Sequence, residues 1–405
     1  MKIRSITYFC NPMYPLDEKV LQKAATFLSE AQSAYEAAGY EVQTTRLATI
    51  PFPKLFRSDD FSRSKATKVA TTLSEILPQI GVAYASLGPA LIKYPDSYEV
   101  IPEAIAASEN IFFGGEMASR KKGISLSAIK ACAEIVQKAS TIIPDGFANL
   151  RFAALANVDA GAPFFPAAYH DADADEPAFA IATESADVAL QAFEAAKSIE
   201  EGRNNLVSEI ERHGKKLAEV AKSLNFRFYG IDFSLAPFPD DAHSLGNTVE
   251  KMGVPKIGLH GSLAAAAILT EAVDRADFPH TGFSGFMQPI LEDSVLARRA
   301  AEGILTIKDV LLYSAVCGTG MDTIPLPGDT TAEQITPLLL DLCALALRLD
   351  KPLTARLMPV PGKKAGDKTN FDFAFFAPSR VMALESAELN APLNSQEILQ
   401  INKRG

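Results

Sequence analysis

Strand-like and helix-like segments alternate along nearly the whole chain, and this alternation constrains the fold more than any other feature. Residues 3–9 alternate apolar and polar side chains, as a half-buried strand does. Residues 16–38 repeat apolar side chains every three or four positions, as one face of a helix does. Strands separated by helices of this length favour a parallel α/β organisation. We therefore predict an α/β fold with about nine or ten strands, enough to close into a barrel.

The same alternation continues to the C-terminal part of the chain. Further strands are predicted at residues 40–47, 81–87, 110–113, 147–156, 178–183, 226–233, 353–358 and 371–376. Further helices are predicted at residues 62–77, 125–139, 185–224 (with breaks near Gly202 and Gly214), 244–252, 262–273, 294–302 and 331–349. No linker rich in Gly, Ser or Pro divides the chain. We expect one domain over residues 1–405, with a loosely packed tail from about residue 385.

The charge balance argues against a nucleic-acid binder. The chain carries 39 Lys and Arg against 49 Asp and Glu, a formal net charge of −10. Affinity for nucleic acid comes largely from basic side chains that neutralise phosphates, and the densest basic run here covers only residues 120–122. We therefore expect no nucleic-acid partner and instead a small anionic metabolite. A homo-oligomer is expected because many cytosolic barrels associate.

Neither a membrane span nor a disulfide framework is expected. The longest stretch of small apolar residues, 263–269, is far below the ~20 residues that a bilayer requires. The first residues lack the apolar core of a signal peptide. The four cysteines are far apart and form no C-x-x-C pair. We expect a cytoplasmic protein with free thiols.

The segment from residue 314 to residue 331 carries the densest set of chemically active residues. Cys317 precedes a Gly-Thr-Gly turn, and Asp322 follows five residues after the cysteine. A thiol and a carboxylate on one loop suit nucleophilic catalysis or metal binding if the pKa of the thiol is lowered. The alternative is a buried structural cysteine in a Gly-rich turn. We take Cys317 and Asp322 as candidate catalytic residues.

A second candidate region covers residues 229–244. Asp232 and Ser234 stand at the end of a predicted strand, and His243 follows a pair of aspartates. Carboxylates near a histidine suit general acid–base catalysis or a divalent metal. The alternative is that these residues form turns and cap the next helix. We take Asp232 and His243 as catalytic candidates and Ser234 as a substrate-binding one.

Other residues are candidates for binding an anion. The Gly-Phe-Ser-Gly turn at residues 282–285 presents backbone N–H groups, so Ser284 and Gly285 are candidates. Arg356 at a strand end can bind a carboxylate or phosphate through two parallel hydrogen bonds. Further candidates are Arg151, His170 and Lys363. The alternatives are a packing corner for the proline–phenylalanine segment near His170 and an exposed lysine pair at residues 363–364.

Short motifs occur in a fixed order along the chain. They are RSIT at 4–7, PFFP at 163–166 with YH at 169–170, GIDFSLAP at 230–237, FSG at 283–285, CG at 317–318 with MD at 321–322, PGDT at 327–330, and Arg356 with PVPGK at 359–363. In this order they resemble an uncharacterised family, known as domain of unknown function 711, over nearly the whole chain.

This resemblance implies a ten-stranded α/β barrel of two five-stranded parallel halves, similar in fold to pyruvate formate-lyase and anaerobic ribonucleotide reductase. In those enzymes a cysteine-bearing loop enters the barrel, and residues 317–322 are similar to it in position. The chain has no Arg-Val-x-Gly-aromatic segment, so glycyl-radical chemistry is not expected. Relatives are often encoded beside a small ACT-domain protein, which implies a partner of that kind and a role in amino-acid metabolism.

Three functions fit these observations. The first is a lyase, isomerase or hydrolase acting on a keto or amino acid, with Arg151 and Arg356 binding the carboxylate. The second is a metal-dependent hydrolase or lyase, in which a divalent cation is the only cofactor suggested. Its predicted ligands are Asp232, His243, Glu292 and Asp322. The third is a non-catalytic regulatory protein that binds a small molecule. Converging titratable groups favour the first two functions, and a pocket of backbone and apolar groups favours the third.

Overall fold

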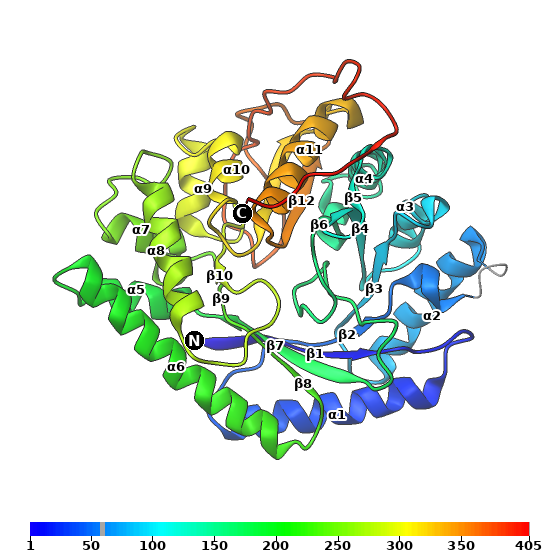
Figure 1. Ribbon diagram of the computed structural model, residues 1–405, viewed down its shortest axis with the longest axis horizontal. Helices are drawn as coiled ribbons and strands as arrows, with labels where there is room; N and C mark the ends of the chain where they lie inside the picture. Colours follow the sequence, from blue (N-terminus) through cyan, green and yellow to red (C-terminus); the bar gives the residue numbers. More distant parts are fainter. Residues whose placement is uncertain (57–60, 405) are drawn as a thin grey trace.

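The computed structural model describes residues 1–56 and 61–404, and in this part of the chain most strands belong to one large sheet (Figure 1). Nine strands follow one another in the order β11-β12-β6-β4-β3-β2-β1-β7-β8, and β5 and β13 attach beside β4. A separate small sheet pairs β9 with β10. The strands are β1 (Lys2–Cys10), β2 (Thr45–Thr49), β3 (Tyr84–Ala90), β4 (Ile111–Ser119), β5 (Gly123–Ser125), β6 (Phe152–Ala156), β7 (Ala178–Glu184), β8 (Phe228–Asp232), β9 (Ser234–Leu235), β10 (Gly285–Phe286), β11 (Gly320–Pro327), β12 (Leu353–Val360) and β13 (Ile398–Leu399).

The large sheet is mostly parallel, as predicted, but it contains two antiparallel junctions. The five strands β1, β2, β3, β4 and β6 are parallel neighbours. The pair β7–β8 joins this group antiparallel through β1, and the pair β11–β12 joins it antiparallel through β6. One five-stranded parallel half is therefore present, and the remaining strands of the path form two parallel pairs.

The sheet is not the closed ten-stranded barrel that we expected. Among the described residues, the edge strands β8 and β11 do not pair with each other. Residues 279–290 lie between them and make single parallel bridges, from His280 to Ile231 and from Pro289 to Asp322. A regular ladder cannot form along this segment because Pro289 lacks an N–H group and Gly282 and Gly285 adopt positive φ angles.

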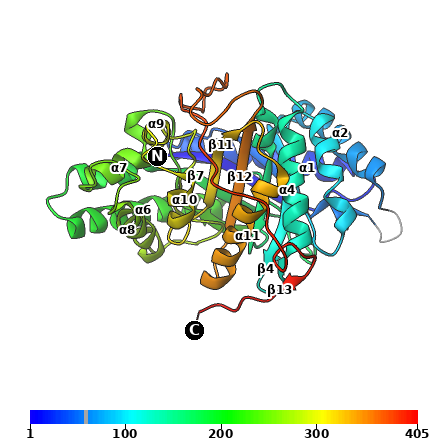
Figure 2. The same cartoon turned by 90° about the horizontal axis from the view of Figure 1, so that it is seen from above.

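Helices cover the outer face of the large sheet. In Figure 2, α1, α2 and α4 lie on one flank and α6 to α10 lie on the other, with α11 beside β12. The helices are α1 (Glu18–Ala37), α2 (Arg63–Gln79), α3 (Val100–Ala106), α4 (Leu126–Ser140), α5 (Ala186–Glu194), α6 (Ile199–Ser223), α7 (Leu245–Lys251), α8 (Ser262–Arg275), α9 (Ser294–Ala301), α10 (Ile307–Tyr313) and α11 (Ala332–Leu349). No helix of the described residues is long and apolar enough to cross a membrane.

The predicted helices are confirmed where capping residues mark their ends. Ser62, Ser125 and Ser244 accept hydrogen bonds from the first turns of α2, α4 and α7. The predicted breaks at Gly202 and Gly214 are wrong, because α6 runs through both residues and the chain breaks before it instead. A Cβ atom at Gly202 would lie 2.4 Å from the Phe193 ring. These glycines therefore allow close packing and do not end the helix.

One predicted strand and one predicted loop in the C-terminal part of the chain also need correction. Residues 371–376 form turns and no strand, while β11 occupies part of the segment that we expected to be a loop. Residues 320–322 are therefore part of the sheet, so residues 317–322 do not form an inserted loop. The segment from 147 to 156 begins with the short 3-10 helix Phe147–Arg151, and only its second part is strand β6.

The core is divided by the sheet. The large cluster lies between the outer face of the sheet and the helices. Two small clusters lie on the opposite face, one around Phe9, Phe112 and Phe165 and one around Leu155 and Phe283. All four cysteines are free, as predicted, and all four are buried. Because the inner face is only partly filled by these clusters, it has room for a cavity.

Candidate functional site

A cavity of about 650 Å³ lies on the inner face of the large sheet. Its lining combines charged residues from the strands with aromatic residues from the loops. The residues of the lining that carry charge are Arg4, Arg46, Glu109, Arg151, Asp232, Glu292, Asp322 and Arg356. A concave site of this size with converging charged groups is typical of small-molecule binding.

A chain of ion pairs runs along one wall of the cavity. Arg356 donates from Nε to Asp322 Oδ1 at 2.5 Å and from Nη2 to Asp322 Oδ2 at 2.9 Å. Nη2 of Arg356 also donates to Glu292 Oε1 at 2.9 Å. The other oxygen of Glu292 accepts from Arg4, which in turn donates to Glu184 Oε2 at 3.2 Å. Charges of opposite sign therefore alternate along five side chains, and each of the two arginines is neutralised by carboxylates.

Two irregularities of the strands place these side chains. In β1 the register with β7 shifts between Ile3 and Ser5, so Arg4 is the extra residue of a bulge. In β11 the register shifts between Met321 and Ile324, so Asp322 and Thr323 together stand opposite Arg356. Bulges redirect side chains, and here they bring Arg4 and Asp322 into the cavity wall.

In this chain of ion pairs, burial and the arginines have opposite effects on the pKa values of Asp322 and Glu184. Burial raises the pKa of Asp322, while Arg356 lowers it and Glu292 raises it further. Burial likewise raises the pKa of Glu184, and Arg4 opposes this rise. Glu184 Oε1 is buried and has no hydrogen-bond partner among the described residues. The arginines therefore partly offset the rise that burial causes in the pKa values of Asp322 and Glu184.

Arg46 differs from the other arginines of the cavity. Its guanidinium lies 5.1 Å from the centre of the Phe165 ring and 6.0 Å from that of Tyr84, and Nε donates to Thr44 Oγ1 at 2.8 Å. Among the described residues no carboxylate lies within ion-pair distance of Arg46, and neither Nη atom has a hydrogen-bond partner. Burial lowers the pKa of Arg46 to about 9, and Arg4 contributes to this. Arg46 therefore remains a cation at neutral pH with both Nη groups available.

Asp232 is a buried carboxyl at the end of β8 that is held by Ser234 and by the turn at residues 282–285. Ser234 Oγ donates to its Oδ1 at 2.5 Å, and Ser284 N donates to the same oxygen at 2.9 Å. Phe283 N donates to Oδ2 at 3.0 Å. Burial raises the pKa of Asp232, while these three hydrogen bonds oppose the rise. Since a carboxylate has about four acceptor positions, one on Oδ2 is left for a ligand or a proton.

The Gly-Phe-Ser-Gly turn explains why Asp232 is held so closely. Gly282 has a φ of +66°, and a Cβ atom there would lie 2.3 Å from Asp232 Oδ2. The absence of this atom lets the turn approach the carboxylate and present the two N–H groups of residues 283 and 284. The turn was predicted to present N–H groups to an anion, and the anion that it holds is Asp232 of the same chain.

With this geometry described, comparison with known proteins gives the family. The family model described as "Uncharacterised ACR (DUF711)" matches residues 1–379. The chain belongs to the DUF711 family. A UPF0210 protein of Pyrobaculum aerophilum is 30 % identical over 394 residues, covering 91 % of this chain and 87 % of its own length. Another, of Acetivibrio thermocellus, is 28 % identical and covers 87 % of this chain and 82 % of its own length.

Five of the predicted site residues of this DUF711 protein line the cavity. They are Arg151, Asp232, Ser234, Asp322 and Arg356. Arg151 has a structural task as well, because it donates to Ser108 O at 2.5 Å and to Ile105 O at 2.9 Å, at the C-terminal end of α3. Burial lowers the pKa of Arg151 to about 10. It thus completes the hydrogen bonding of a helix end, as a cation favourably does.

Cys317 lies outside this cavity. Its Sγ accepts from Gly320 N at 3.1 Å and lies 3.8 Å from Gln288 Nε2. The residue is buried beside a different pocket of about 420 Å³, which Lys351 also lines. The glycines next to Cys317 allow close packing, since a Cβ atom at Gly318 would lie 2.7 Å from Ser284 O. The structure therefore favours the structural cysteine that we considered as the alternative.

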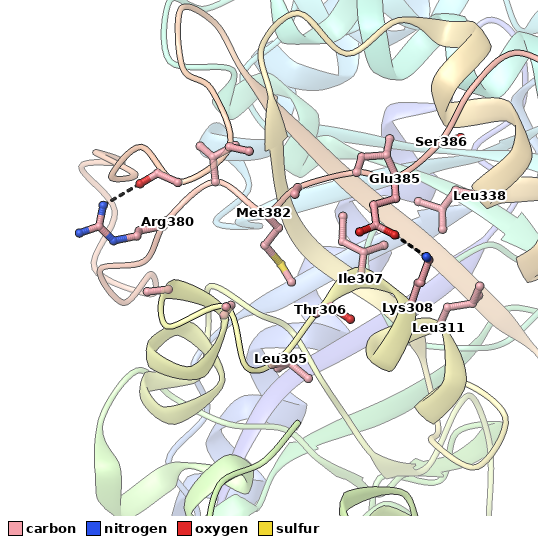
Figure 3. Close-up of a pocket in the computed structure, with 18 of the residues that line it drawn as sticks. Leu305, Thr306, Ile307, Lys308, Leu311, Leu338, Arg380, Met382, Glu385 and Ser386 are labelled. Atoms are coloured by element: carbon pink, nitrogen blue, oxygen red, sulfur yellow. Dashed lines mark hydrogen bonds and ion pairs between the residues drawn. The ribbon is translucent and has the colours of Figure 1, made fainter. Parts of the chain in front are cut away.

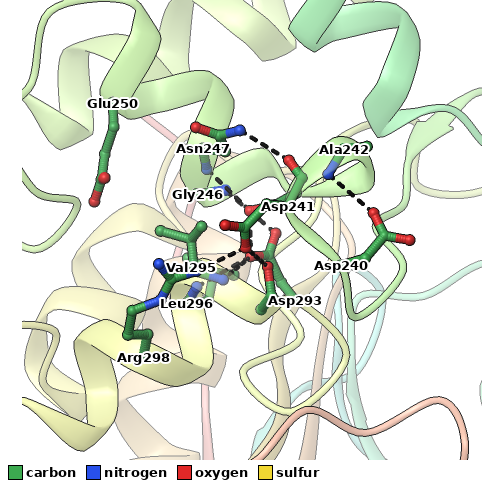
Figure 4. A network of polar contacts seen from close by, with 12 residues as sticks. Asp240, Asp241, Ala242, Gly246, Asn247, Glu250, Asp293, Val295, Leu296 and Arg298 are labelled. Atoms are coloured by element: carbon green, nitrogen blue, oxygen red, sulfur yellow. Dashed lines mark hydrogen bonds and ion pairs between the residues drawn. The ribbon is translucent and has the colours of Figure 1, made fainter.

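His243 also lies outside the lining. Its Nδ1 lies 2.8 Å from Asp240 Oδ1, in a short 3-10 helix before α7. The neighbouring Asp241 pairs with Arg298. In Figure 4 these aspartates surround the starts of α7 and α9, where Asp293 accepts from several backbone N–H groups. Asp240 and Asp293 therefore cap helices, as the alternative interpretation proposed for this region, and His243 contacts the capping Asp240.

The remaining predicted ligands have other surroundings. His170 is buried against Phe9 and Tyr229, and burial lowers its pKa. Ser284 supports Asp232, and Gly285 pairs with Ser234 in the small sheet. Lys363 lies on the turn after β12 and does not line the cavity.

The predicted metal ligands do not come together. Asp322 and Glu292 both contact Arg356, Asp232 is held by the turn at residues 282–285, and His243 pairs with Asp240. Among the described residues, no group of three or more His, Cys, Asp or Glu side chains is placed to hold a metal ion. The donor set of the metal-dependent hypothesis is therefore not assembled.

Three residues of the site were not predicted from the sequence as site residues: Arg4, Arg46 and Glu184. All three are charged residues within strands β1, β2 and β7, where apolar and small side chains prevail. Arg4 and Arg46 stand inside their strands and Glu184 ends its strand, and a charged residue in a buried strand is rare unless it is paired or functional. The charged residue in a strand of apolar and small side chains was therefore the sequence feature that could have identified these residues.

A second cavity, of about 660 Å³, lies between α9, α10 and α11 and the segment around residues 380–386 (Figure 3). Leu305, Ile307, Leu338 and Met382 give it an apolar lining. Its charged pair, Lys308 with Glu385, is largely exposed. Its one buried polar group without a partner among the described residues is the Ser386 hydroxyl, which is neutral, whereas the inner cavity has the cationic Arg46, so the inner cavity is the stronger candidate site.

Proposed function

We propose that this DUF711 protein is an enzyme that binds a small organic acid in the inner cavity and moves a proton on it. The observation that carries the proposal is Arg46. A planar guanidinium with two free Nη groups matches the two oxygens of a carboxylate. The rings of Phe165 and Tyr84 and the hydroxyl of Thr44 hold this guanidinium in place. The other strand arginines of the cavity are already occupied by carboxylates of the protein.

Asp232 supplies the proton-transfer group in this proposal. Its remaining acceptor position on Oδ2 lets it take a proton from the substrate or return one. Enzymes use burial to bring the pKa of such carboxyls toward neutral pH, and burial is the largest influence on Asp232. Proton transfer next to a carbonyl or amino group of a keto or amino acid is the step of a lyase or isomerase. The ion pair of Asp322 with Arg356 contributes a fixed field along the wall.

The second part of the proposal is that residues 279–290 close the large sheet into a barrel-like fold around the inner cavity. The single bridges from this segment to both edge strands support it. Residues 279–290 bridge both edges of the large sheet, so they take the place of a tenth strand in an irregular form. Such a closure would give the two parallel halves of the pyruvate formate-lyase-like fold.

The experiment is calorimetric titration of the protein with acetate, pyruvate and 2-oxobutanoate. We expect binding, and we expect Arg46→Gln to weaken it about 10- to 100-fold, because a hydrogen bond to a charged group contributes about 1.5–3 kcal/mol. Arg227→Gln is the matched control: Arg227 also lies over a tyrosine ring, at 5.4 Å from Tyr229, but it is exposed and outside the cavity lining. Equal affinity in Arg46→Gln and the wild type would contradict the proposal.

Turnover separates an enzyme from a regulatory binding protein. In deuterated water, wild-type protein should exchange the hydrogen next to the carbonyl of a bound 2-oxo acid faster than buffer does, as seen by proton NMR. Asp232→Asn should lose this exchange while it still binds the acid. Binding without any exchange would favour the regulatory function instead.

A further inference from the structure

We infer that the acid bound by Arg46 carries an apolar tail of several carbons or an aryl ring. The inference rests on the proposed function, since it concerns the other end of the same ligand. The aromatic wall, as we name Phe147, Phe164, Phe165, Phe373 and Phe375, lines the cavity together with the charged groups. A carboxylate alone would occupy the charged part of the cavity and leave this wall uncovered.

The two kinds of lining come mostly from different parts of the fold. The charged groups come mainly from strands of the sheet, whereas Phe147, Phe373 and Phe375 come from segments outside it. Phe165 and Phe164 stand at the junction, because they lie against the guanidinium groups of Arg46 and Arg356. A ligand that follows this division has one charged end and one apolar end.

The outer part of the wall is held in place by its own packing. The ring centroids of Phe147 and Phe373 are 5.0 Å apart, and those of Phe238 and Phe375 are 5.6 Å apart. Nevertheless Phe147, Phe373 and Phe375 are only half-buried, and the neighbouring Ile143 is 36 % exposed. Prearranged apolar surface that faces a cavity gains most when a ligand covers it.

The size of the cavity agrees with a longer ligand. Its volume of about 650 Å³ lies within the range of sites that enclose ligands of drug-like size, about 300–1,000 Å³. An acid of three carbons would leave most of this volume to water. A longer alkyl tail would fill more of this volume and cover apolar lining that an acid of three carbons leaves to water.

The test is a series of straight-chain 2-oxo acids: pyruvate, 2-oxobutanoate, 2-oxopentanoate and 2-oxohexanoate. We expect the affinity to rise about threefold to fourfold with each methylene, since each buried CH₂ contributes about 0.8 kcal/mol. The double variant Phe373→Ala, Phe375→Ala should lose most of this rise, so that the whole series spans less than about fivefold. Leu393→Ala, an exposed apolar residue outside the lining, is the control and should keep the rise.

Each outcome decides a different point. Equal affinity for all four acids in the wild type would overturn the apolar tail and leave the carboxylate site standing. A rise that persists in the double variant would overturn the aromatic wall as the place of the tail. Binding of none of the acids would overturn the proposed function and this inference together.

Discussion

The four arginines of the inner cavity differ in what they contact, and this decides their roles. Arg4 and Arg356 each contact two carboxylates, and Arg151 donates to backbone carbonyls. Arg46 alone among them contacts neither a carboxylate nor a backbone carbonyl among the described residues, and its one side-chain hydrogen bond goes to Thr44 Oγ1. An incoming carboxylate would give this partly buried cation the ionic partner that it lacks within the protein.

At the same scale, Asp232 should make stability depend on pH in a definite direction. Its pKa is raised in the folded state, so between the unfolded pKa and the folded pKa the folded protein binds more protons than the unfolded one. The free energy of unfolding of the wild type, relative to Asp232→Asn, should therefore fall as pH rises from about 4 toward neutral. Urea unfolding of both proteins at several pH values measures this. A relative stability that rises over that range would contradict the raised pKa.

Residue types at strand ends could be predicted from sequence, and their partners could not. Asp232 and Arg356 stood out because each stands at the end of a predicted strand, and Asp322 stood out because it follows Cys317 in a Gly-rich segment that was expected to be a loop. Cys317 stood out because of its glycines, and those glycines serve close backbone packing. Arg46 did not stand out, because its special feature is the absence of a partner, which only the three-dimensional arrangement shows.

At the scale of elements, one buried carboxylate connects two helices. Asp293 Oδ1 accepts from Val295 N and Leu296 N at the start of α9, and Oδ2 accepts from Leu245 N and Gly246 N at the start of α7 (Figure 4). Ser244 Oγ also donates to it at 2.6 Å. Two helix N-termini therefore share a single capping side chain, and this fixes where residues 287–292 enter the cavity wall.

We predict that Asp293→Ala lowers the free energy of unfolding by about 2–4 kcal/mol, because two caps are lost at about 1–2 kcal/mol each. Chemical denaturation with a circular dichroism signal measures this loss. Asp241→Ala is the control in the same network, since its ion pair with Arg298 is exposed and contributes about 0–1 kcal/mol. Equal losses in the two variants would contradict a shared cap.

Helices were more predictable than strands for a physical reason. Helix periodicity and caps are local, as in α2 and α4, whereas a strand is stabilised by neighbours that are distant in sequence. Residues 320–327 contain Gly and two Pro and were expected to be a loop, yet they pair with β12 at the edge of the sheet. Prolines are tolerated at such an edge because their missing N–H groups are not needed there.

At the scale of the whole molecule, the ion-pair chain links parts that lie far apart in sequence. Glu292 contacts Arg4 of β1 and Arg356 of β12, so the segment between the two sheet edges is tied to both sides of the cavity. The α/β class and the mostly parallel sheet followed from the alternation of segments. The two antiparallel junctions and the open edge did not, because no local pattern encodes which strands become neighbours.

The central claim is that Arg46 receives a carboxylate in the inner cavity. The most direct measurement is a crystal structure of the protein grown with 2-oxohexanoate. We predict one bound acid, with its carboxylate oxygens about 2.7–3.0 Å from Nη1 and Nη2 of Arg46 and its alkyl chain against Phe373 and Phe375. An acid bound elsewhere while the inner cavity holds only water, or a carboxylate of the protein itself on Arg46, would contradict the account.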